Sequence, residues 1–349
     1  MTHEELLDNI RHGVRVEGAD CRGWDLSGVD LSGAMLECVD LSGANLRSAN
    51  LAGSILTNCV ADACDFSQSR WSGTKMFRSR MDAARFDGAF LDECAFAACE
   101  LVRASFVDAN LNVSVFSDCR LAESRFQTQV FDRTSFVGCE LARADFSGAS
   151  MSFVTFLQLD LTSLVFAGAR CESAMFVECD LTRQNFAGQS LRLCQFTDSK
   201  LDEADFRNAT LTQSNFKGTS LCKANFSGAD AALTMFAEAD LSDADCRGGR
   251  FDQSIWVDAK MKNIVFDDAR LPLSVLHRAC CTGASFRRAE LQDADFSYAD
   301  LTGANLTDAH FLRTRLHRAV QQGARFSGRG GIIENDPDLH KAQAWSDSR

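Results

Sequence analysis

The sequence predicts a repeat architecture, an elongated domain in which short units stack on one another. From residue 19 to residue 328 the chain consists of 62 consecutive five-residue units without insertion or deletion. The central residue of each unit, at a number ending in 1 or 6, is Leu or Phe in 49 of the 62 units. A period of five matches neither the face of an α-helix nor the alternation of a β-strand. Each unit can therefore bury its central residue only by stacking on its neighbours.

The residues before the repeat predict a short helix. Thr2 and Glu5 have the spacing of a capping box, in which each side chain accepts a hydrogen bond from the other residue's backbone. Leu6, Leu7 and Ile10 are expected on one side of such a helix. We assign residues 1–18 to an N-terminal helical cap, because a stack of repeats needs a cover for its open apolar end.

The units carry a recognisable motif as well as a period. Residues 39–43 read VDLSG, residues 144–148 read ADFSG and residues 299–303 read ADLTG. They resemble the A(D/N)LXX motif of the pentapeptide-repeat family, and the resemblance covers roughly nine-tenths of the chain. It implies an all-β fold with short terminal helices: a right-handed quadrilateral parallel β-solenoid over residues 19–328, in which four units form one coil. At about 4.8 Å per coil, the solenoid would be about 74 Å long.

The distribution of phenylalanine supports coils of four units. Between Phe86 and Phe236, Phe occupies mainly the centres whose numbers end in 6, and only Phe77, Phe90 and Phe153 of the 27 Phe residues lie away from a centre. With four units per coil, this alternation places Phe on two opposite sides of a filled core. The interior then has no pocket for a substrate.

Some inward positions, which usually hold a small residue, hold a bulky one instead. Val154, Leu159 and Leu164 predict a wider or bent coil. Because a buried amide without a partner costs about 1–3 kcal/mol, an amide at such a position should bond the backbone or swing outward. Three inward positions hold Gln129, Gln184 and Gln189.

After residue 328 the repeat ends in Arg-Gly-Gly, and we assign residues 329–349 to a C-terminal tail. Asp336 and Pro337 have the order of an N-cap followed by proline at the first helical position. A short helix from there to Trp345 is expected, either capping the same chain or mediating dimerisation.

The fifteen cysteines follow the repeat and show no zinc-binding spacing. Buried free cysteine behaves as a small apolar residue, and a reduced, cytoplasmic protein is implied. No secretory signal peptide is evident, although export by a signal-independent machine stays open. Eight cysteines occupy inward small-residue positions: Cys59, Cys64, Cys94, Cys99, Cys119, Cys139, Cys179 and Cys194.

We expect no catalytic, cofactor-binding or metal-binding residue, and no enzymatic activity. The six histidines are scattered, and no phosphate- or dinucleotide-binding motif is present. The carboxylates at the motif's Asp/Asn position are expected to bond the backbone at the corners of the coil. These are Asp25, Asp30, Asp40, Asp65, Asp145, Asp240, Asp245, Asp295 and Asp300.

Two functions of different classes remain. The first is a non-enzymatic protein-interaction scaffold, because the uninterrupted repeat behind a short helix resembles pentapeptide-repeat modules found with bacterial type VI secretion systems. The alternative is mimicry of DNA, as in family members that protect DNA gyrase. Duplex DNA of about 74 Å carries about 44 charges, whereas the chain has a net charge of −12. A basic band also interrupts the acidic surface, formed by Arg70, Lys75, Arg78, Arg80 and Arg85.

One side of the coil is predicted to be apolar on its outer surface. We expect this side to bind either a partner protein or a second copy of the chain. β-Propensity on exposed strands offers a simpler origin for the same pattern. We expect no binding to nucleic acid or membrane. The candidate interface consists of Met35, Ile55, Phe77, Val115, Val137, Leu157, Met175, Val177, Met235, Ile255 and Val257.

Overall fold

The computed structural model describes residues 1–335 and 341 and contains two compact units, Met1–Asp180 and Leu181–Arg349. The predicted C-terminal helix from Asp336 to Trp345 lies outside the described residues. Each unit is a right-handed quadrilateral parallel β-solenoid, as predicted. The coil has twenty residues, because each strand pairs with the strand one coil later, as Leu36 pairs with Leu56.

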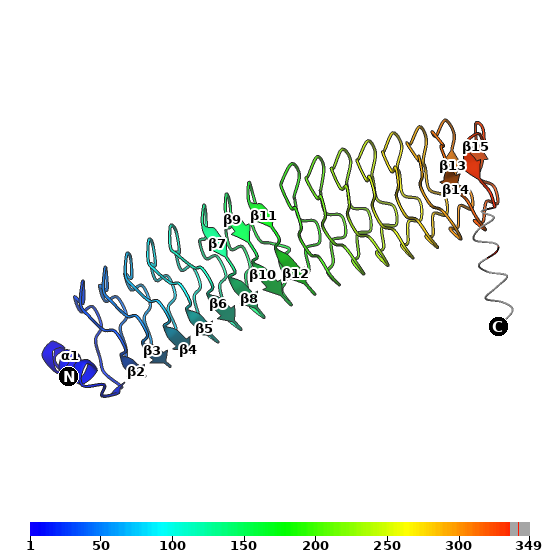
Figure 1. Ribbon diagram of the computed structural model, residues 1–349. Coiled ribbons are helices and arrows are strands. Elements are labelled where there is room, and N and C mark those ends of the chain that lie inside the picture. The colour runs from blue at the N-terminus through cyan, green and yellow to red at the C-terminus, as the bar shows by residue number, and fades with distance from the viewer. Residues whose placement is uncertain (336–340, 342–349) are drawn as a thin grey trace. The chain divides into compact units, whose positions relative to one another are not determined.

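In the first unit (Met1–Asp180), nine short strands form one parallel sheet in the order β1-β2-β3-β4-β5-β6-β8-β10-β12, and β7, β9 and β11 form a second sheet on the neighbouring side of the coil (Figure 1). The strands are β1 (Val16–Glu17), β2 (Met35–Glu37), β3 (Ile55–Thr57), β4 (Lys75–Phe77), β5 (Ala95–Ala97), β6 (Val115–Ser117), β7 (Val130–Asp132), β8 (Ser135–Val137), β9 (Ser150–Ser152), β10 (Thr155–Leu157), β11 (Arg170–Glu172) and β12 (Met175–Val177).

In the second unit (Leu181–Arg349), most coils pair through single parallel bridges, such as Met235 with Ile255. Among its described residues, regular strands occur from residue 305 onward: β13 (Asn305–Leu306) pairs with β15 (Arg325–Phe326), and β14 (Thr314–Arg315) pairs with β16 (Ile332–Ile333). Pairing therefore continues past residue 328, where the repeat ends. Gly331 makes this return possible, because its φ is +85° and a Cβ there would collide with the carbonyl group of Phe311.

The helix α1 (His3–Arg11) begins with the predicted capping box. The Thr2 N–H donates to Glu5 Oε2 at 2.8 Å, and the Glu5 N–H donates to Thr2 Oγ1 at 3.2 Å. Leu6 and Ile10 are buried, and α1 covers the end of the first coil (Figure 1). Coil pairing begins at Val16, one unit earlier than residue 19, because Val16 already occupies a central position and pairs with Leu36.

Two columns of stacked rings fill the core of the first unit, as the alternation of Phe predicts. Phe96, Phe116 and Phe136 lie in one column, with ring centroids 4.6 and 5.1 Å apart. Phe106 belongs to the opposite column and meets Phe116 edge-on at 5.9 Å. Offset-stacked and edge-on rings are the favoured arrangements of aromatic pairs. In the second unit, Phe196, Phe216 and Phe236 stack in the same way.

The aspartates of the motif bond the backbone at the corners, as predicted. In all nine, Oδ1 accepts a hydrogen bond of 2.9–3.1 Å from the N–H two residues later. These bonds help to lower the pKa of Asp65 and Asp145, against the desolvation that opposes them. The carboxylates are thus structural.

Beside the bulky residue Leu159, backbone pairing between two successive coils is interrupted. One coil earlier, the Glu140 N–H donates to the Cys119 carbonyl at 2.9 Å, and the Leu121 N–H donates to the Glu140 carbonyl at 2.7 Å. Among the residues that the structure describes, the corresponding bonds of Asp160 with Cys139 and Leu141 are absent. A large inward side chain therefore separates two coils locally.

The eight inward cysteines are buried, as predicted, and all fifteen are free thiols. Burial raises the pKa of Cys59 to about 11 and that of Cys94 to about 12. Only Cys38 is exposed, and Cys222 and Cys280 are half-buried.

We expect N-ethylmaleimide at neutral pH to modify Cys38 rapidly in the native protein and the buried thiols only after denaturation, because the thiolate is the reactive form. Mass spectrometry of peptides from native and urea-treated samples measures this. Rapid modification of Cys94 in the native protein would contradict the packing.

Candidate functional site

The outward face of the nine-stranded sheet contains eight of the eleven residues of the candidate interface. Each strand places its central residue in the core, as Phe156 of β10, and its two flanking residues outside. Because every strand repeats this order in exact register, the flanking residues form two parallel columns on the surface. The exposed fraction is 39% for Met35, 40% for Ile55 and 41% for Met175.

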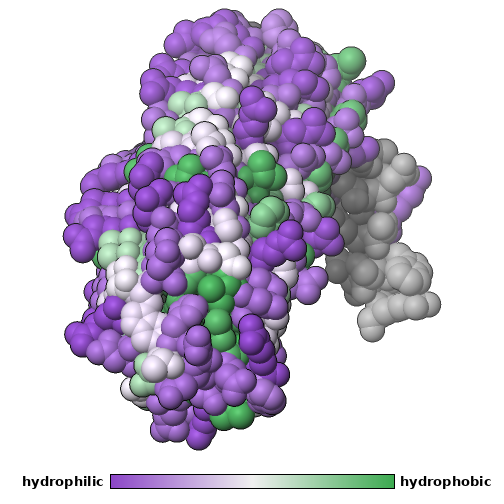
Figure 2. Space-filling view, turned by 90° about the vertical axis from the view of Figure 1, so that its left-hand side faces the viewer, coloured by the Kyte–Doolittle hydropathy of each residue, from purple (hydrophilic) through white to green (hydrophobic). Residues whose placement is uncertain are grey.

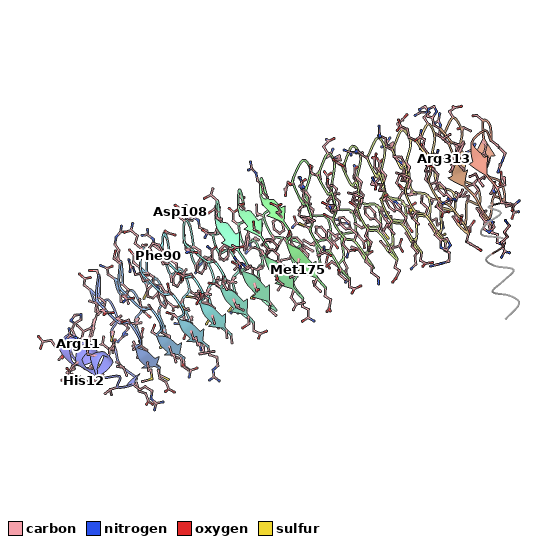
Figure 3. All side chains as sticks on the ribbon, in the orientation of Figure 1. Arg11, His12, Phe90, Asp108, Met175 and Arg313 are labelled. Atoms are coloured by element: carbon pink, nitrogen blue, oxygen red, sulfur yellow. The ribbon has the colours of Figure 1, made fainter. Side chains whose placement is uncertain are left out.

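The apolar residues of this face are concentrated toward β12. Val137, Leu157 and Val177 pair in succession across β8, β10 and β12, and Met175 stands on the same strand as Val177. We call these four residues the apolar patch. Met175 lies on the outer side of β12 (Figure 3).

Polar residues divide the rest of the face. Lys75 lies between Ile55 and Ala95 in one column, and Ser135 and Thr155 separate Val115 from Met175. Val115 pairs with Ala95 in the same column, whereas Phe77 pairs with Ala97 in the other column, and both Phe77 and Val115 are exposed. On the surface seen in Figure 2, hydrophobic side chains form separate clusters among hydrophilic ones.

The other three predicted interface residues belong to the second unit. Met235 and Ile255 pair through a parallel bridge, and Val257 follows the next centre, Trp256. All three are half-buried. The first unit thus offers the more exposed apolar side chains of the predicted interface.

On the other sides of the coils, many charged residues form ion pairs. The guanidinium group of Arg120 lies between Glu100 and Glu140, with nitrogen–oxygen distances of 3.9 and 3.2 Å. Arg80 of the predicted basic band pairs with Asp62 at 2.6 Å. In the second unit, Arg288 pairs with Asp268, also at 2.6 Å. Exposed pairs of this kind add little stability, but they lower the local charge.

The part of the chain that the structure describes contains no group of three His, Cys, Asp or Glu side chains able to hold a metal ion. The rings of His277 and His317 each contact Tyr298, with centroids 5.3 and 5.7 Å away. Within the described residues, no helix has the length and the apolar character needed to cross a membrane.

A polar hollow in the first unit is a feature that the sequence analysis missed. It has a volume of about 320 Å³ and is lined by Asp108, Ala109, Asn110, Asn112, Thr128, Gln129 and Val130. The sequence signal for it is the amide of Gln129 at an inward position, where a small residue is usual. Gln129 Nε2 donates to the Ala109 carbonyl, so the predicted bond to the backbone is confirmed. Gln189 Nε2 likewise donates to the Asn185 carbonyl, at 3.1 Å.

Comparison with protein families finds two matching models. The model described as a pentapeptide repeat region matches residues 129–206 and 169–246. The model described as pentapeptide repeats in eight copies matches residues 25–60 and 294–328. Together the matched ranges include more than half of the chain. A search of curated proteins found no match.

Similar solved structures include HetL, a pentapeptide repeat protein involved in heterocyst differentiation regulation from the cyanobacterium Nostoc sp. strain PCC 7120. It is 18% identical, with 96% of this chain and 98% of HetL covered and a TM-score of 0.24. Full-length QnrB1, a plasmid-mediated fluoroquinolone resistance protein, is 15% identical, with 84% of this chain and 100% of QnrB1 covered and a TM-score of 0.22. A pentapeptide repeat protein from the Arabidopsis thaliana thylakoid lumen is 24% identical, with 32% of this chain and 66% of that chain covered and a TM-score of 0.17.

Proposed function

Because the chain belongs to the pentapeptide-repeat family, we propose that it is a non-enzymatic scaffold that binds a partner protein through the outward face of the nine-stranded sheet. The observation that supports this proposal most directly is the apolar patch of Val137, Leu157, Met175 and Val177 on adjacent strands in exact register. A partner with an apolar surface segment would bury these side chains, and burial of apolar area is favourable in water.

The rigidity of the sheet supports the same role. The central residue of each strand is locked in the core, since Phe136, Phe156 and Phe176 are fully buried and stacked. The backbone between the outward side chains is therefore held in one conformation before a partner arrives. A preorganised surface loses less conformational entropy on binding than a flexible one.

The test replaces Leu157 and Met175 by lysine. We expect the double variant to bind the partner about 10- to 100-fold more weakly, because each buried anchor of an interface typically contributes at least 1 kcal/mol. The unaltered chain serves as bait in native lysate, and affinity for the recovered partner is then measured by calorimetry. The matched control, Val60→Lys with Val165→Lys, adds the same charge at half-buried and exposed positions on other sides of the coil.

Both variants should keep the circular dichroism spectrum and melting temperature of the unaltered chain. Unchanged partner affinity in the folded Leu157→Lys/Met175→Lys variant would exclude this face as the interface. Light scattering can instead show self-association that the Leu157→Lys/Met175→Lys variant loses and the control keeps. In that case the face binds a second copy of the chain, and the proposal of a different partner protein is wrong.

A narrower form of the proposal makes the partner a component of a bacterial type VI secretion system, as the resemblance of the repeat behind its short helix implies. The competing function is modulation of DNA gyrase by mimicry of duplex DNA. Identification of the proteins that copurify in native lysate separates the two, because secretion components and gyrase subunits are different sets.

The ion pairs favour the scaffold over the DNA mimic. A mimic must present carboxylates at nearly the charge density of duplex phosphate, whereas carboxylates such as Asp62, Asp268 and Glu140 are each paired with arginine. We expect micromolar protein to inhibit gyrase poorly in a supercoiling assay. Strong inhibition that weakens with added salt would favour the mimic.

A further inference from the structure

Three cysteines form a column of thiols in the core of the first unit. Cys99, Cys119 and Cys139 occupy the same inward position in three successive coils, and they are the only cysteines of the sequence that lie 20 residues apart. The strands before them, β5, β6 and β8, pair in exact register. The three side chains therefore start from equivalent backbone positions, each about 4.8 Å from the next.

The sulfur atoms repeat with the coils, because the three side chains have the same surroundings. In each, Sγ lies 3.3–3.4 Å from the carbonyl oxygen 23 residues earlier and 3.3–3.5 Å from the carbonyl oxygen two residues earlier. Successive sulfur atoms are thus also about 4.8 Å apart. The interactions of Cys119 with Cys139 and then with Cys99, together with burial, raise the pKa of the Cys119 thiol well above its ordinary value.

This spacing matches a metal ion held by two thiolates. A metal–thiolate bond is about 2.3 Å long, so a linear sulfur–metal–sulfur unit spans about 4.6 Å. Thiolates are soft ligands that select Cu(I), and Cu(I) forms linear complexes with two of them. Zn(II) instead requires four ligands in a tetrahedron, and the described part of the chain contains no group of even three suitable side chains.

The column is less tightly closed at the end nearest Leu159. The Glu140 N–H donates to the Cys119 carbonyl at 2.9 Å, whereas the corresponding bond from Asp160 to Cys139 is absent among the described residues. Cys139 is 6% exposed, compared with 1% for Cys119. Because local opening of the coil after Cys139 breaks fewer backbone bonds, a small ion can reach Cys119 and Cys139 from this end.

We propose that Cys119 and Cys139 bind one Cu(I) ion as a linear pair of thiolates between two coils. Each thiol loses its proton as its sulfur–copper bond forms, so two protons leave for each ion and the copper stays Cu(I). The two sulfur atoms are held at this spacing only in the folded state. The bound ion should therefore raise the melting temperature of the first unit.

The test measures Cu(I) binding to the full chain under anaerobic conditions. Every sample carries Cys38→Ser, which removes the exposed thiol. Copper is supplied as its coloured complex with the chelator bicinchoninate, so the loss of colour on competition gives the affinity and the number of ions bound. We expect one tightly held ion, and X-ray absorption should show two sulfur neighbours around it. Zn(II) should not displace the ion.

Cys119→Ser should weaken Cu(I) binding at least about 100-fold, since the loss of partners that merely orient metal ligands already costs about 10- to 100-fold. The variant leaves Cys99 and Cys139 two coils apart, too far for one ion to bridge. Serine suits this inward position, because Ser79 occupies it one coil before Cys99 and is 2% exposed.

The matched control is Cys94→Ser. Cys94 is as deeply buried as Cys119, at 1% exposed, but the equivalent positions one coil away hold Thr74 and Ser114 instead of thiols. This control should bind Cu(I) with the affinity of the chain that carries Cys38→Ser alone. Circular dichroism checks that each variant is folded.

Cys99→Ser should keep the ion, because the pair of Cys119 and Cys139 is intact. The proposal is overturned if the chain with Cys38→Ser alone takes no copper from bicinchoninate, or if Cys119→Ser binds as tightly as Cys94→Ser does. Loss of binding in Cys99→Ser overturns the assignment to Cys119 and Cys139. These readouts do not involve the outward face of the nine-stranded sheet, so they are independent of the proposed scaffold function.

Discussion

Replacing Phe116 by alanine is expected to lower the free energy of unfolding of the first unit by about 3–5 kcal/mol. The ring is fully buried and stacks on Phe96 at 4.6 Å and on Phe136 at 5.1 Å. It also meets Phe106 edge-on, so both columns of the core lose contacts at once. The cavity cannot collapse easily, because the backbone ladders on neighbouring sides hold the coils at fixed spacing. Urea unfolding followed by circular dichroism measures the loss.

The control is Phe77→Ala, which removes the same atoms from a position that is 36% exposed. Its effect should stay within about 1 kcal/mol, as is usual for surface positions. Equal destabilisation by the two substitutions would mean that the stacked columns are not the main source of stability in this unit.

A second large effect is expected from opening the N-terminal end of the first unit. Leu6→Asp with Ile10→Asp places two carboxylates where α1 packs on the first coil, at positions that are 2% and 8% exposed. The helix should detach and expose both the end of the apolar core and the unpaired edge of β1. Open ends of this kind pair with other chains, so we expect most of the protein to form large assemblies.

Size-exclusion chromatography with light scattering measures the mass distribution of this variant against the unaltered chain. Val14→Asp is the control, because the side chain is 49% exposed and lies outside the helix. If the double variant keeps the mass of the unaltered chain, α1 is not needed as a cover.

Features tied to the five-residue register were predictable from sequence. Position within a unit decides whether a side chain points inward, so the burial of the Phe centres and of the inward cysteines followed directly from their numbering. The corner bonds of residues such as Asp145 reach only two residues along the chain, and the capping box of α1 spans three. Local rules were sufficient for all of these.

Features that depend on the fit between coils required the structure. Gln129 and Leu159 both stood out as too large for their positions, but whether they would bend, swing outward or separate the coils depended on neighbours twenty residues away. Among the described residues, backbone hydrogen bonds between coils are absent beside both residues, and a polar hollow lies beside Gln129. The grouping of Val137, Leu157 and Val177 likewise follows from cross-coil register, together with the exposure that neighbouring side chains allow. A repeat sequence specifies the direction in which each side chain points. The spacing between coils depends on a balance between side-chain volume and backbone hydrogen bonding, and only the packed structure shows the result of that balance.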